Sequence, residues 1–440
     1  MLVELEYADP LKLYGVLREE DYPFILESLS RHELKARYTY ISANPEFTVE
    51  VGDGVRIDGK KVSRENSPFR ALKARHNWNN LNEVKFSGGF VGYIAYDAVH
   101  AYIDGIIDQN SFFGYYNQVF IYDHILNKVY YFSTTDSSSE VRYAENMISR
   151  AKRYRLEDEE GGSSIENCDS EKEEFMDSVD AAKDYIFSGD AFQIVLSREY
   201  QMSSDFSPFR IYRNIRNVNP SPYMFLLEFD KDIVGASPET MASVEGDTFK
   251  INPIAGTCER GKSEEEDREF ARKMLCDEKE KAEHVMLVDL ARNDVRKVSR
   301  SGSVTLSRYF DVAKYSHVQH IESEVTGQLE EHATLFDAME ASFPAGTLTG
   351  APKVRAMEII DELEKSKRRV YGGAVGYFSS NGYADMAIAI RMLEIDDCCR
   401  IRAGAGIVAD SDPEKEFYET ERKMAGVMKA LEVDSDTDNR

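Results

Sequence analysis

The chain is poor in cysteine, in tryptophan and in long apolar runs, and each shortage excludes a class of protein. Its 440 residues contain five cysteines and one tryptophan. The cysteines are odd in number and none are spaced as CxxC, so neither a disulfide framework nor a thiolate zinc site is indicated. Because no run of about 18 apolar residues occurs, we expect no membrane-spanning helix. The first residues, Met1-Leu-Val-Glu-Leu-Glu-Tyr7, lack the basic start and apolar stretch of a signal peptide, and we expect a cytoplasmic protein.

Positive charge is also scarce. The 54 lysines and arginines are outnumbered by 79 aspartates and glutamates, which gives a formal net charge of −25. Binding to nucleic acid requires a basic face that neutralises phosphates, and the sequence shows none. If the substrate is an anion, local cations must bind it, and a bound metal with a few arginines and lysines would serve.

The organisation that remains is that of a large globular protein, with 42% apolar residues. We divide the chain into a sheet-rich N-terminal region at 1–156, an acidic flexible loop at 157–174, a long C-terminal region at 175–432 and a polar tail at 433–440. Residue periodicity and capping signals predict the following elements. Strands are expected at 90–96, 118–122, 128–132, 192–200, 223–229, 374–378, 384–392 and 400–407, and helices at 174–188, 207–217, 263–290, 334–342, 352–363 and 413–431. The expected fold class is α/β of the α+β type, with antiparallel sheets covered by helices and two possibly interleaved domains.

Two pairs of glutamates have a spacing that places both carboxylates on one helix face. Glu280 and Glu283 lie in one expected helix, and Glu416 and Glu419 lie in another that begins at Asp412-Pro413. Hard cations such as Mg²⁺ prefer carboxylate oxygens and keep water or substrate oxygens in their remaining positions. The pairs therefore suggest a divalent-metal site, although glutamates at this spacing usually face solvent or pair with lysine.

Glycine-rich turns separate several of the expected strands and helices, at 253–257, 345–353, 371–373 and 402–406. Glycine lets a ligand approach the backbone closely. The second turn leads into a helix and could present free amides to an anion. It is not a Walker A motif, because Pro352 separates Gly350-Ala351 from Lys353 and Val354 follows instead of Ser or Thr.

From about Gly189 to Lys423 the sequence resembles the chorismate-utilising enzymes, and most closely the synthase subunit, component I, of anthranilate synthases. The matching segments occur in the same order as in the family. They are 188–198, 219–225, Ser237-Pro-Glu239, 253–257, 282–294, 315–320, 343–353, 371–391 and 402–423, with weaker matches at 26–28 and 37–40. The resemblance implies the chorismate-binding enzyme fold, with the active site between sheets.

The resemblance also implies roles for individual residues. Glu280, Glu283, Glu416 and Glu419 would surround one Mg²⁺ that binds the ring carboxylate of chorismate. The enolpyruvyl carboxylate would be held by Arg391, Tyr371, Lys423 and the backbone near Gly404 and Gly406, while Gly256, Thr257 and Thr347 would line the ring pocket. Glu239 matches the general acid for loss of the C4 hydroxyl, which requires that burial keep it protonated near neutral pH. His320 would assist proton removal at C2, and His317 is interpreted as structural.

Two positions indicate which nucleophile attacks. Relatives that use water carry a lysine base where this chain has Gln193, and relatives that aminate C4 carry a lysine where it has Ala255. Both residues therefore favour direct attack of ammonia at C2. Cys258 departs from the arginine that often follows the Gly-Thr of this turn, which puts the contacts around the turn in doubt.

Two further segments resemble the family's tryptophan feedback site, although the second is also an ordinary turn sequence. These candidate tryptophan-binding residues are Glu27, Ser28, Asn219, Pro220, Ser221, Pro222, Tyr223 and Met224. No cysteine lies in a nucleophile-elbow context, so a fused glutaminase module is not expected. Ammonia is expected from solution or from a glutamine amidotransferase subunit, in an α₂β₂ complex.

The expected function is thus Mg²⁺-dependent formation of anthranilate, the first committed step of tryptophan biosynthesis, with feedback inhibition by tryptophan. The first alternative is aminodeoxychorismate synthase, which shares nearly every catalytic residue. Isochorismate or salicylate synthase is disfavoured by Gln193. A non-enzymatic tryptophan-binding regulator is disfavoured because Glu239, His320 and the four glutamates are all present.

Overall fold

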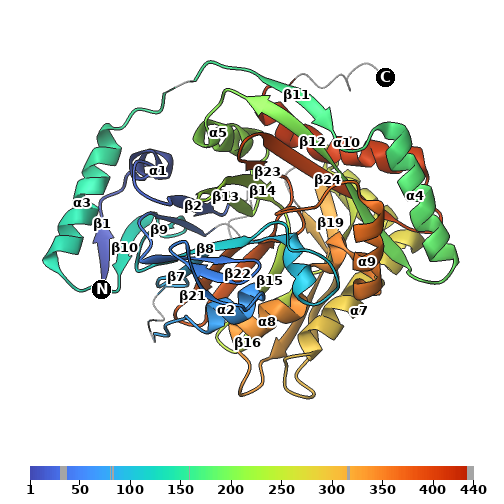
Figure 1. Cartoon of the computed structure of the whole chain (residues 1–440), viewed down its shortest axis with the longest axis horizontal. Helices are drawn as coiled ribbons and strands as arrows, with labels where there is room; N and C mark the ends of the chain where they lie inside the picture. The colour runs from blue at the N-terminus through green and yellow to red at the C-terminus, as the bar shows by residue number, and fades with distance from the viewer. Residues whose placement is uncertain (30–36, 80, 82–83, 158, 315–317, 434–440) are drawn as a thin grey trace.

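The computed structural model describes residues 1–29, 37–79, 81, 84–157, 159–314 and 318–433. Two large antiparallel sheets dominate it (Figure 1). The first has the order β1 (Leu2–Leu5), β10 (Lys128–Ser133), β9 (Gln118–Asp123), β3 (Tyr38–Ser42), β2 (Phe24–Glu27), β13 (Tyr223–Glu228), β14 (Asp232–Ser237), β23 (Met392–Ile395), β24 (Cys399–Ile407), β12 (Gln193–Ser204) and β11 (Ser163–Cys168), with β20 (Gly350–Ala351) paired to β12.

The second sheet is built in the same way from segments far apart in the chain. Its order is β17 (Ile254–Glu259), β19 (Val318–Gln328), β16 (Thr248–Ile251), β15 (Thr240–Glu245), β22 (Tyr383–Ile388), β21 (Ala374–Ser379), β7 (Gly89–Ile94), β8 (Ser111–Tyr116), β4 (Phe47–Val51), β5 (Val55–Ile57) and β6 (Lys60–Ser63), with β18 (Thr305–Lys314) paired to β19. Both sheets therefore combine strands from the N-terminal and C-terminal regions. The predicted fold class is confirmed.

Helices cover the outer faces of the two sheets. They are α1 (Pro10–Leu17), α2 (Pro68–Lys73), α3 (Ser138–Arg153), α4 (Lys172–Phe187), α5 (Pro208–Val218), α6 (Glu264–Cys276), α7 (Glu278–Arg296), α8 (Leu335–Ser342), α9 (Lys353–Leu363) and α10 (Pro413–Ala430), with 3₁₀ turns η1 (Tyr96–Ala101) and η2 (Gly346–Leu348). A core rich in aromatic residues, including Phe24, Tyr93, Phe225 and Tyr377, fills the space between the sheets. In Figure 1, α3 and the N-terminus lie at one end of the molecule, and α4 and α9 lie at the other.

Capping chemistry explains where the helices of the C-terminal region begin. The Ser263 hydroxyl accepts the backbone N–H of Glu266, and the Asp412 carboxylate accepts the N–H groups of Glu414 and Lys415 at the start of α10. A side-chain oxygen at this position satisfies donors that have no partner within the helix. Both predicted helix starts are confirmed.

Three predicted elements are corrected by the structure. The helix expected at 263–290 is two helices, because Asp277 is extended and its carboxylate caps α7 through the N–H groups of Lys279 and Glu280. The strand expected at 384–392 is also divided: β22 belongs to one sheet and β23 to the other, with Arg391 in the left-handed region between them at φ 54°. The acidic segment 157–174 is not a loop throughout, since it contains β11 and the start of α4. Polar side chains suit β11 because it is an edge strand.

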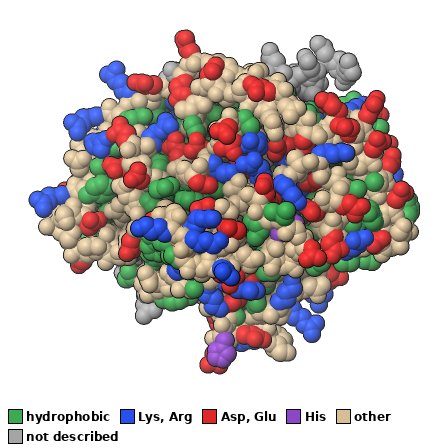
Figure 2. Space-filling model, viewed as in Figure 1, with side chains coloured by type: hydrophobic (Ala, Val, Ile, Leu, Met, Phe, Trp, Pro, Cys, Tyr) green, Lys and Arg blue, Asp and Glu red, His purple; other side chains and the backbone are tan. Residues whose placement is uncertain are grey.

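Charged side chains of both signs are interspersed over the face shown in Figure 2. In the part of the chain that the structure describes, no helix is both long enough and apolar enough to cross a membrane.

Candidate active site

The candidate site lies where the chain crosses between the two sheets. Glu239 connects β14 of the first sheet to β15 of the second, and Arg391 lies on the crossing from β22 back to β23. The two crossings are tied together, since the N–H of Ala236 donates to the carbonyl of Arg391 at 3.1 Å and that of Ile388 donates to the carbonyl of Glu239 at 3.0 Å. Two side chains far apart in sequence are thereby fixed at the same seam.

Glu239 has the environment of a carboxylic acid that titrates near neutrality. It is partly buried beside a cavity of about 40 Å³ whose walls include Leu287, Leu290 and Ile388. Burial raises its pKa from 4.5 to about 7, while a hydrogen bond from the Thr347 hydroxyl, at 2.9 Å, and the charge of Lys423 act in the opposite direction. Loss of hydration destabilises the charged form more than these two partners stabilise it. Such a group can donate a proton near pH 7.

A basic cluster lies on the β24 side of the site. Arg391 Nη1 donates to the carbonyl of Lys423 at 2.8 Å, and Lys423 Nζ donates to the carbonyl of Gly404 at 2.8 Å and pairs with Glu419 at 2.7 Å. Burial lowers the pKa of Arg391, with Tyr371 and Glu419 opposing the shift. Burial raises the pKa of Tyr371 to about 12, so its hydroxyl stays protonated. A carboxylate bound here would meet an arginine, an ammonium group and a hydroxyl donor.

The glycines of β24 allow neighbouring protein groups to approach its backbone closely. A Cβ at Gly404 would lie 3.1 Å from the Tyr371 hydroxyl, and a Cβ at Gly406 would lie 2.5 Å from Nε2 of Gln193. Gln193 is buried at the start of β12, and its Oε1 has no hydrogen-bond partner among the residues that the structure describes. An unpaired buried amide oxygen is costly unless a ligand or solvent donates to it.

His320 is held in a defined tautomer by the glycine turn of β17. Its Nδ1 lies 2.8 Å from the carbonyl of Gly256 and 3.1 Å from the hydroxyl of Thr257. Since a carbonyl oxygen can only accept, Nδ1 carries the hydrogen and Nε2 is the basic atom of the neutral ring. Burial lowers the pKa of His320, which keeps the ring neutral and able to accept a proton. His317 lies outside the described residues.

The four candidate metal-binding glutamates come from α7 and α10. Burial raises the pKa of Glu280, with the nearby charges of Glu283 and Glu419 among the further causes, and burial together with Glu419 raises the pKa of Glu416. Oε2 of Glu280 faces the glycine turn, 3.2 Å from the position of a Cβ on Gly256. Across the described ranges, no three acidic, histidine or cysteine side chains are arranged closely enough to hold a metal ion.

The chemistry of this donor set nevertheless fits a hard divalent cation. All four side chains supply carboxylate oxygens, and their mutual repulsion contributes to the raised pKa of Glu280 and Glu416. A cation would relieve that repulsion. Lys423 and Lys279 provide part of the compensating charge, through the ion pair with Glu419 and the field at Glu416.

The candidate tryptophan residues are only partly brought together. Glu27, Ser28, Pro222, Tyr223 and Met224 line a pocket of about 540 Å³ between the sheets. Asn219, Pro220 and Ser221 are absent from that lining and form the turn after α5, where the carbonyl of Ser221 accepts the N–H of Leu29 at 3.0 Å. The Glu27 carboxylate is buried and accepts from Arg216 at 2.7 and 3.0 Å and from the Tyr212 hydroxyl at 2.9 Å.

Sequence reasoning missed several other residues that line this pocket, among them Tyr38, Tyr40, Lys85, Tyr377 and Asp385. The aromatic pair at 38–40 was part of a weak family match, but the pairing of β3 with β2 is what brings it opposite Ser28. The other three residues gave no signal, because they line the same pocket as Ser28 only once the sheets have folded.

The chain is similar to known proteins over nearly its whole length. Residues 24–429 match the family model described as chorismate binding enzyme. The chain is 59% identical to anthranilate synthase component 1 of Thermococcus kodakarensis, covering 98% of this chain and 99% of the relative, and 54% identical to that of Archaeoglobus fulgidus, covering 97% and 98%. The crystal structure of anthranilate synthase component I from Streptococcus pneumoniae matches with a TM-score of 0.80 at 35% identity, covering 89% of this chain and 92% of that one. The resemblance predicted from the sequence is confirmed, and the chain belongs to the family of chorismate-binding enzymes, on the branch of the anthranilate synthase component 1 proteins.

Proposed function

We propose that this chain converts chorismate and ammonia into anthranilate, pyruvate and water. The observation that carries the proposal is Glu239, a carboxyl group with a pKa of about 7 that is held by Thr347 and faces Lys423. It occupies the same seam as Arg391, a cation suited to a substrate carboxylate. The similarity to anthranilate synthase component 1 proteins supports the same reaction.

The proposed reaction uses Glu239 as the acid and His320 as the base. Ammonia attacks C2 of the chorismate ring, the ring double bonds shift, and the C4 hydroxyl leaves as water with the proton of Glu239. The new ammonium group on C2 then loses one proton to solvent, and Glu239 takes a proton from solvent. In the second step His320 Nε2 accepts the C2 proton, the C3–oxygen bond breaks, and the ring becomes aromatic. The enolpyruvate that leaves takes up one proton at its methylene carbon and becomes pyruvate. The protonated state of Glu239 and the neutral state of His320 are the states that burial favours in each case.

We assign the two carboxylates of chorismate to two different groups of residues, which together orient the substrate. Arg391, Lys423, the Tyr371 hydroxyl and the backbone near Gly404 and Gly406 bind the enolpyruvyl carboxylate. Glu280, Glu283, Glu416 and Glu419 hold Mg²⁺ near the ring carboxylate, and when bound the cation supplies positive charge for that carboxylate.

The nucleophile is ammonia because no basic side chain occupies the two positions that distinguish relatives. Gln193 cannot deprotonate water, and Ala255, buried in β17, carries no amine that could attack the ring. We further propose that a glutamine amidotransferase subunit supplies ammonia in an α₂β₂ complex. L-tryptophan binds the pocket beside Ser28 as a feedback inhibitor.

The test is anthranilate fluorescence from purified protein given chorismate, MgCl₂ and ammonium at about pH 8.5, with each component omitted in turn. We expect signal only when both additions are present, and loss of signal in Glu283→Gln. The matched control is Glu278→Gln on the same helix, whose side chain is 89% exposed, and it should retain activity. Turnover without ammonium would make water the nucleophile, and a C4-aminated product by mass spectrometry would replace the proposal with aminodeoxychorismate synthesis.

A further inference from the structure

A buried arginine that does not face the substrate lies beneath the candidate active site. Arg368 follows α9 and is 3% exposed. Its Nη1 donates to the carbonyl of Leu348 at 2.6 Å, its Nη2 donates to the carbonyl of Val195 at 2.7 Å, and its Nε and Nη2 pair with Glu364 at 3.0 and 2.7 Å. Burial of a guanidinium is expensive unless its donors are paired. Its partners come from three separate segments of the chain.

The bond to Leu348 reaches the general acid through one residue. Leu348 ends η2, and the preceding residue, Thr347, donates its hydroxyl to Glu239. A 3₁₀ turn this short has few internal hydrogen bonds of its own. The bond from Arg368 therefore fixes the carbonyl end of the turn from which Thr347 projects.

The same guanidinium also contacts the other side of the site. Its central carbon lies 4.6 Å from the ring centroid of Tyr96 and 5.9 Å from that of Tyr371. The N–H of Tyr371 donates to the carbonyl of Arg368 at 3.0 Å. Tyr371 is the residue whose hydroxyl approaches Gly404, so both its backbone and its ring are located by Arg368.

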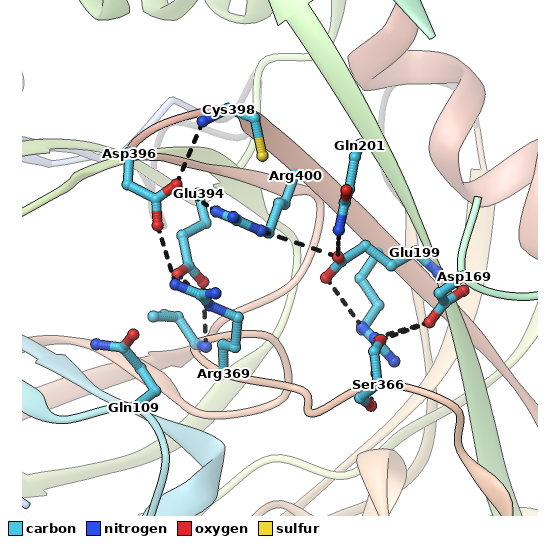
Figure 3. Close-up of polar contacts among 12 residues, drawn as sticks. Gln109, Asp169, Glu199, Gln201, Ser366, Arg369, Glu394, Asp396, Cys398 and Arg400 are labelled. Atoms are coloured by element: carbon cyan, nitrogen blue, oxygen red, sulfur yellow. Dashed lines mark hydrogen bonds and ion pairs between the residues drawn. The ribbon is translucent and has the colours of Figure 1, made fainter. Parts of the chain in front are cut away.

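Glu364 is itself fixed, which prevents the pair from swinging away. Its Oε1 accepts from the N–H and the hydroxyl of Ser197, each at 2.8 Å, and its Oε2 lies 3.4 Å from Nη1 of Arg402. Arg402 continues the network to Asp169 and Glu199 at 3.0 and 3.6 Å. Figure 3 shows the far end of this network, where Asp169, Glu199 and Ser366 lie beside one another.

We propose that Arg368 is a positioning residue, which holds the Thr347 hydroxyl on Glu239 and the Tyr371 hydroxyl beside Gly404. The inference rests on the proposed role of Glu239 as the acid. Arg368 contacts neither the substrate nor the reacting atoms. It acts by keeping two neighbours in the geometry that the reaction requires.

The direction of the expected pH effect follows from the groups that face Glu239. Thr347 on η2 and Lys423 on α10 both stabilise its carboxylate form. Asp294 of α7 lines the same small cavity and is paired with Lys297 at 2.8 Å and with Lys353 at 2.7 Å. Displacing the Thr347 hydroxyl removes one stabiliser of the carboxylate, so the pKa of Glu239 rises further.

The experiment compares Arg368→Lys, Thr347→Val and the double variant in kcat and kcat/KM for chorismate, measured from pH 5.5 to 9.5 at constant free ammonia. Lysine keeps a cation for Glu364 but lacks the planar fork that reaches two carbonyls. We expect Arg368→Lys to lower kcat between about 10-fold and 100-fold and to move the basic limb of kcat/KM upward by about one pH unit. Thr347→Val should move the limb in the same direction. The double variant should move the limb no further, because both changes break the same contact.

Controls separate this inference from a general loss of stability and from the proposed function. Arg18→Lys alters an ion pair with Glu228, at 2.8 Å, between α1 and β13, and should leave the limb unchanged. Ser197→Ala removes one bond to Glu364 and should shift the limb in the same direction by less, which provides a test if Arg368→Lys does not fold. The inference would be overturned if the basic limb of kcat/KM stays in place in Arg368→Lys or in Ser197→Ala. Additive shifts in the double variant would also overturn it. An unmoved limb in Thr347→Val would overturn the role of Glu239 instead.

Discussion

Replacing Glu239 by glutamine should slow the reaction and, at the same time, make the protein more stable above neutral pH. The amide keeps the shape of the carboxyl group and can still accept from Thr347, but it cannot donate a proton to the departing hydroxyl. General acid catalysis contributes about 10²–10⁴-fold, so we expect kcat to fall by that factor, which is about 2.7–5.4 kcal/mol in the barrier. KM for chorismate should change little, because Glu239 is not assigned to substrate binding.

The stability effect follows from the direction of the pKa shift. The pKa of Glu239 rises from 4.5 to about 7 on folding, so the stability that this carboxyl contributes is complete below 4.5 and is lost as the pH rises through 7. At about 1.36 kcal/mol per unit, the shift corresponds to about 3.4 kcal/mol. Because the side chain is only partly buried, we expect the free energy of unfolding that it contributes to fall by about 2 kcal/mol between pH 5 and pH 8. With about 2.1 cal/mol/K of unfolding entropy per residue, that is about 2 °C in Tm for a chain of this length.

The assay pairs anthranilate formation with thermal unfolding at pH 5 and pH 8. The Tm of Glu239→Gln minus the Tm of the wild type should be about 2 °C more positive at pH 8 than at pH 5. The exposed variant Glu278→Gln should show no such difference. A variant that keeps most of its kcat would refute the assignment of the acid, and equal Tm differences at the two pH values would refute the reasoning from burial.

Three further predictions concern the metal, the carboxylate pocket and the regulatory pocket. Mg²⁺ at about 100 times its Kd should stabilise the wild type by about 2.7 kcal/mol in thermal unfolding because it relieves repulsion between carboxylates; Glu280→Gln should lose most of that gain, and an equal gain would remove Glu280 from the site. Gly406→Ala should raise KM for chorismate at least about tenfold, because its Cβ would lie 2.5 Å from Nε2 of Gln193; Gly426→Ala on α10, where a Cβ meets nothing within 4 Å, should keep the normal KM, and the same KM in both variants would contradict the crowding argument. Ser28→Phe should raise the L-tryptophan concentration for half-inhibition at least about tenfold without lowering the uninhibited rate, because the ring would occupy part of the pocket; unchanged sensitivity would exclude Ser28 from the inhibitor site.

Local signals in the sequence predicted much of the secondary structure but not where the chain changes sheets. Helices α4, α5, α8, α9 and α10 follow from capping residues and periodicity, which act within a few residues. Asp277 is compatible with either a helix interior or a cap, so the break between α6 and α7 depends on tertiary packing. Most residues in 384–392 are apolar, with Asp385 and Arg391 as the exceptions, and only the backbone at Arg391 shows that the segment belongs to two sheets.

The candidate site also contains residues that the sequence could identify and one that it could not. Glu239, His320 and Arg391 could be named because their short motifs resemble those of a known family. Arg368 could not, because its role depends on two backbone carbonyls, at 195 and 348, that any residue type could supply. Backbone acceptors leave no compositional signature in a sequence.

The interleaving of the two sheets has a consequence for how the protein is made. On the ribosome, β2 must wait about 200 residues for its partner β13, and β7 must wait about 280 residues for β21. Until then the apolar faces of the N-terminal strands remain exposed, a state in which nascent chains depend on chaperones. We therefore expect a truncated product that ends near residue 160 to aggregate rather than fold. The two halves, if expressed separately, should assemble only when both are present during folding.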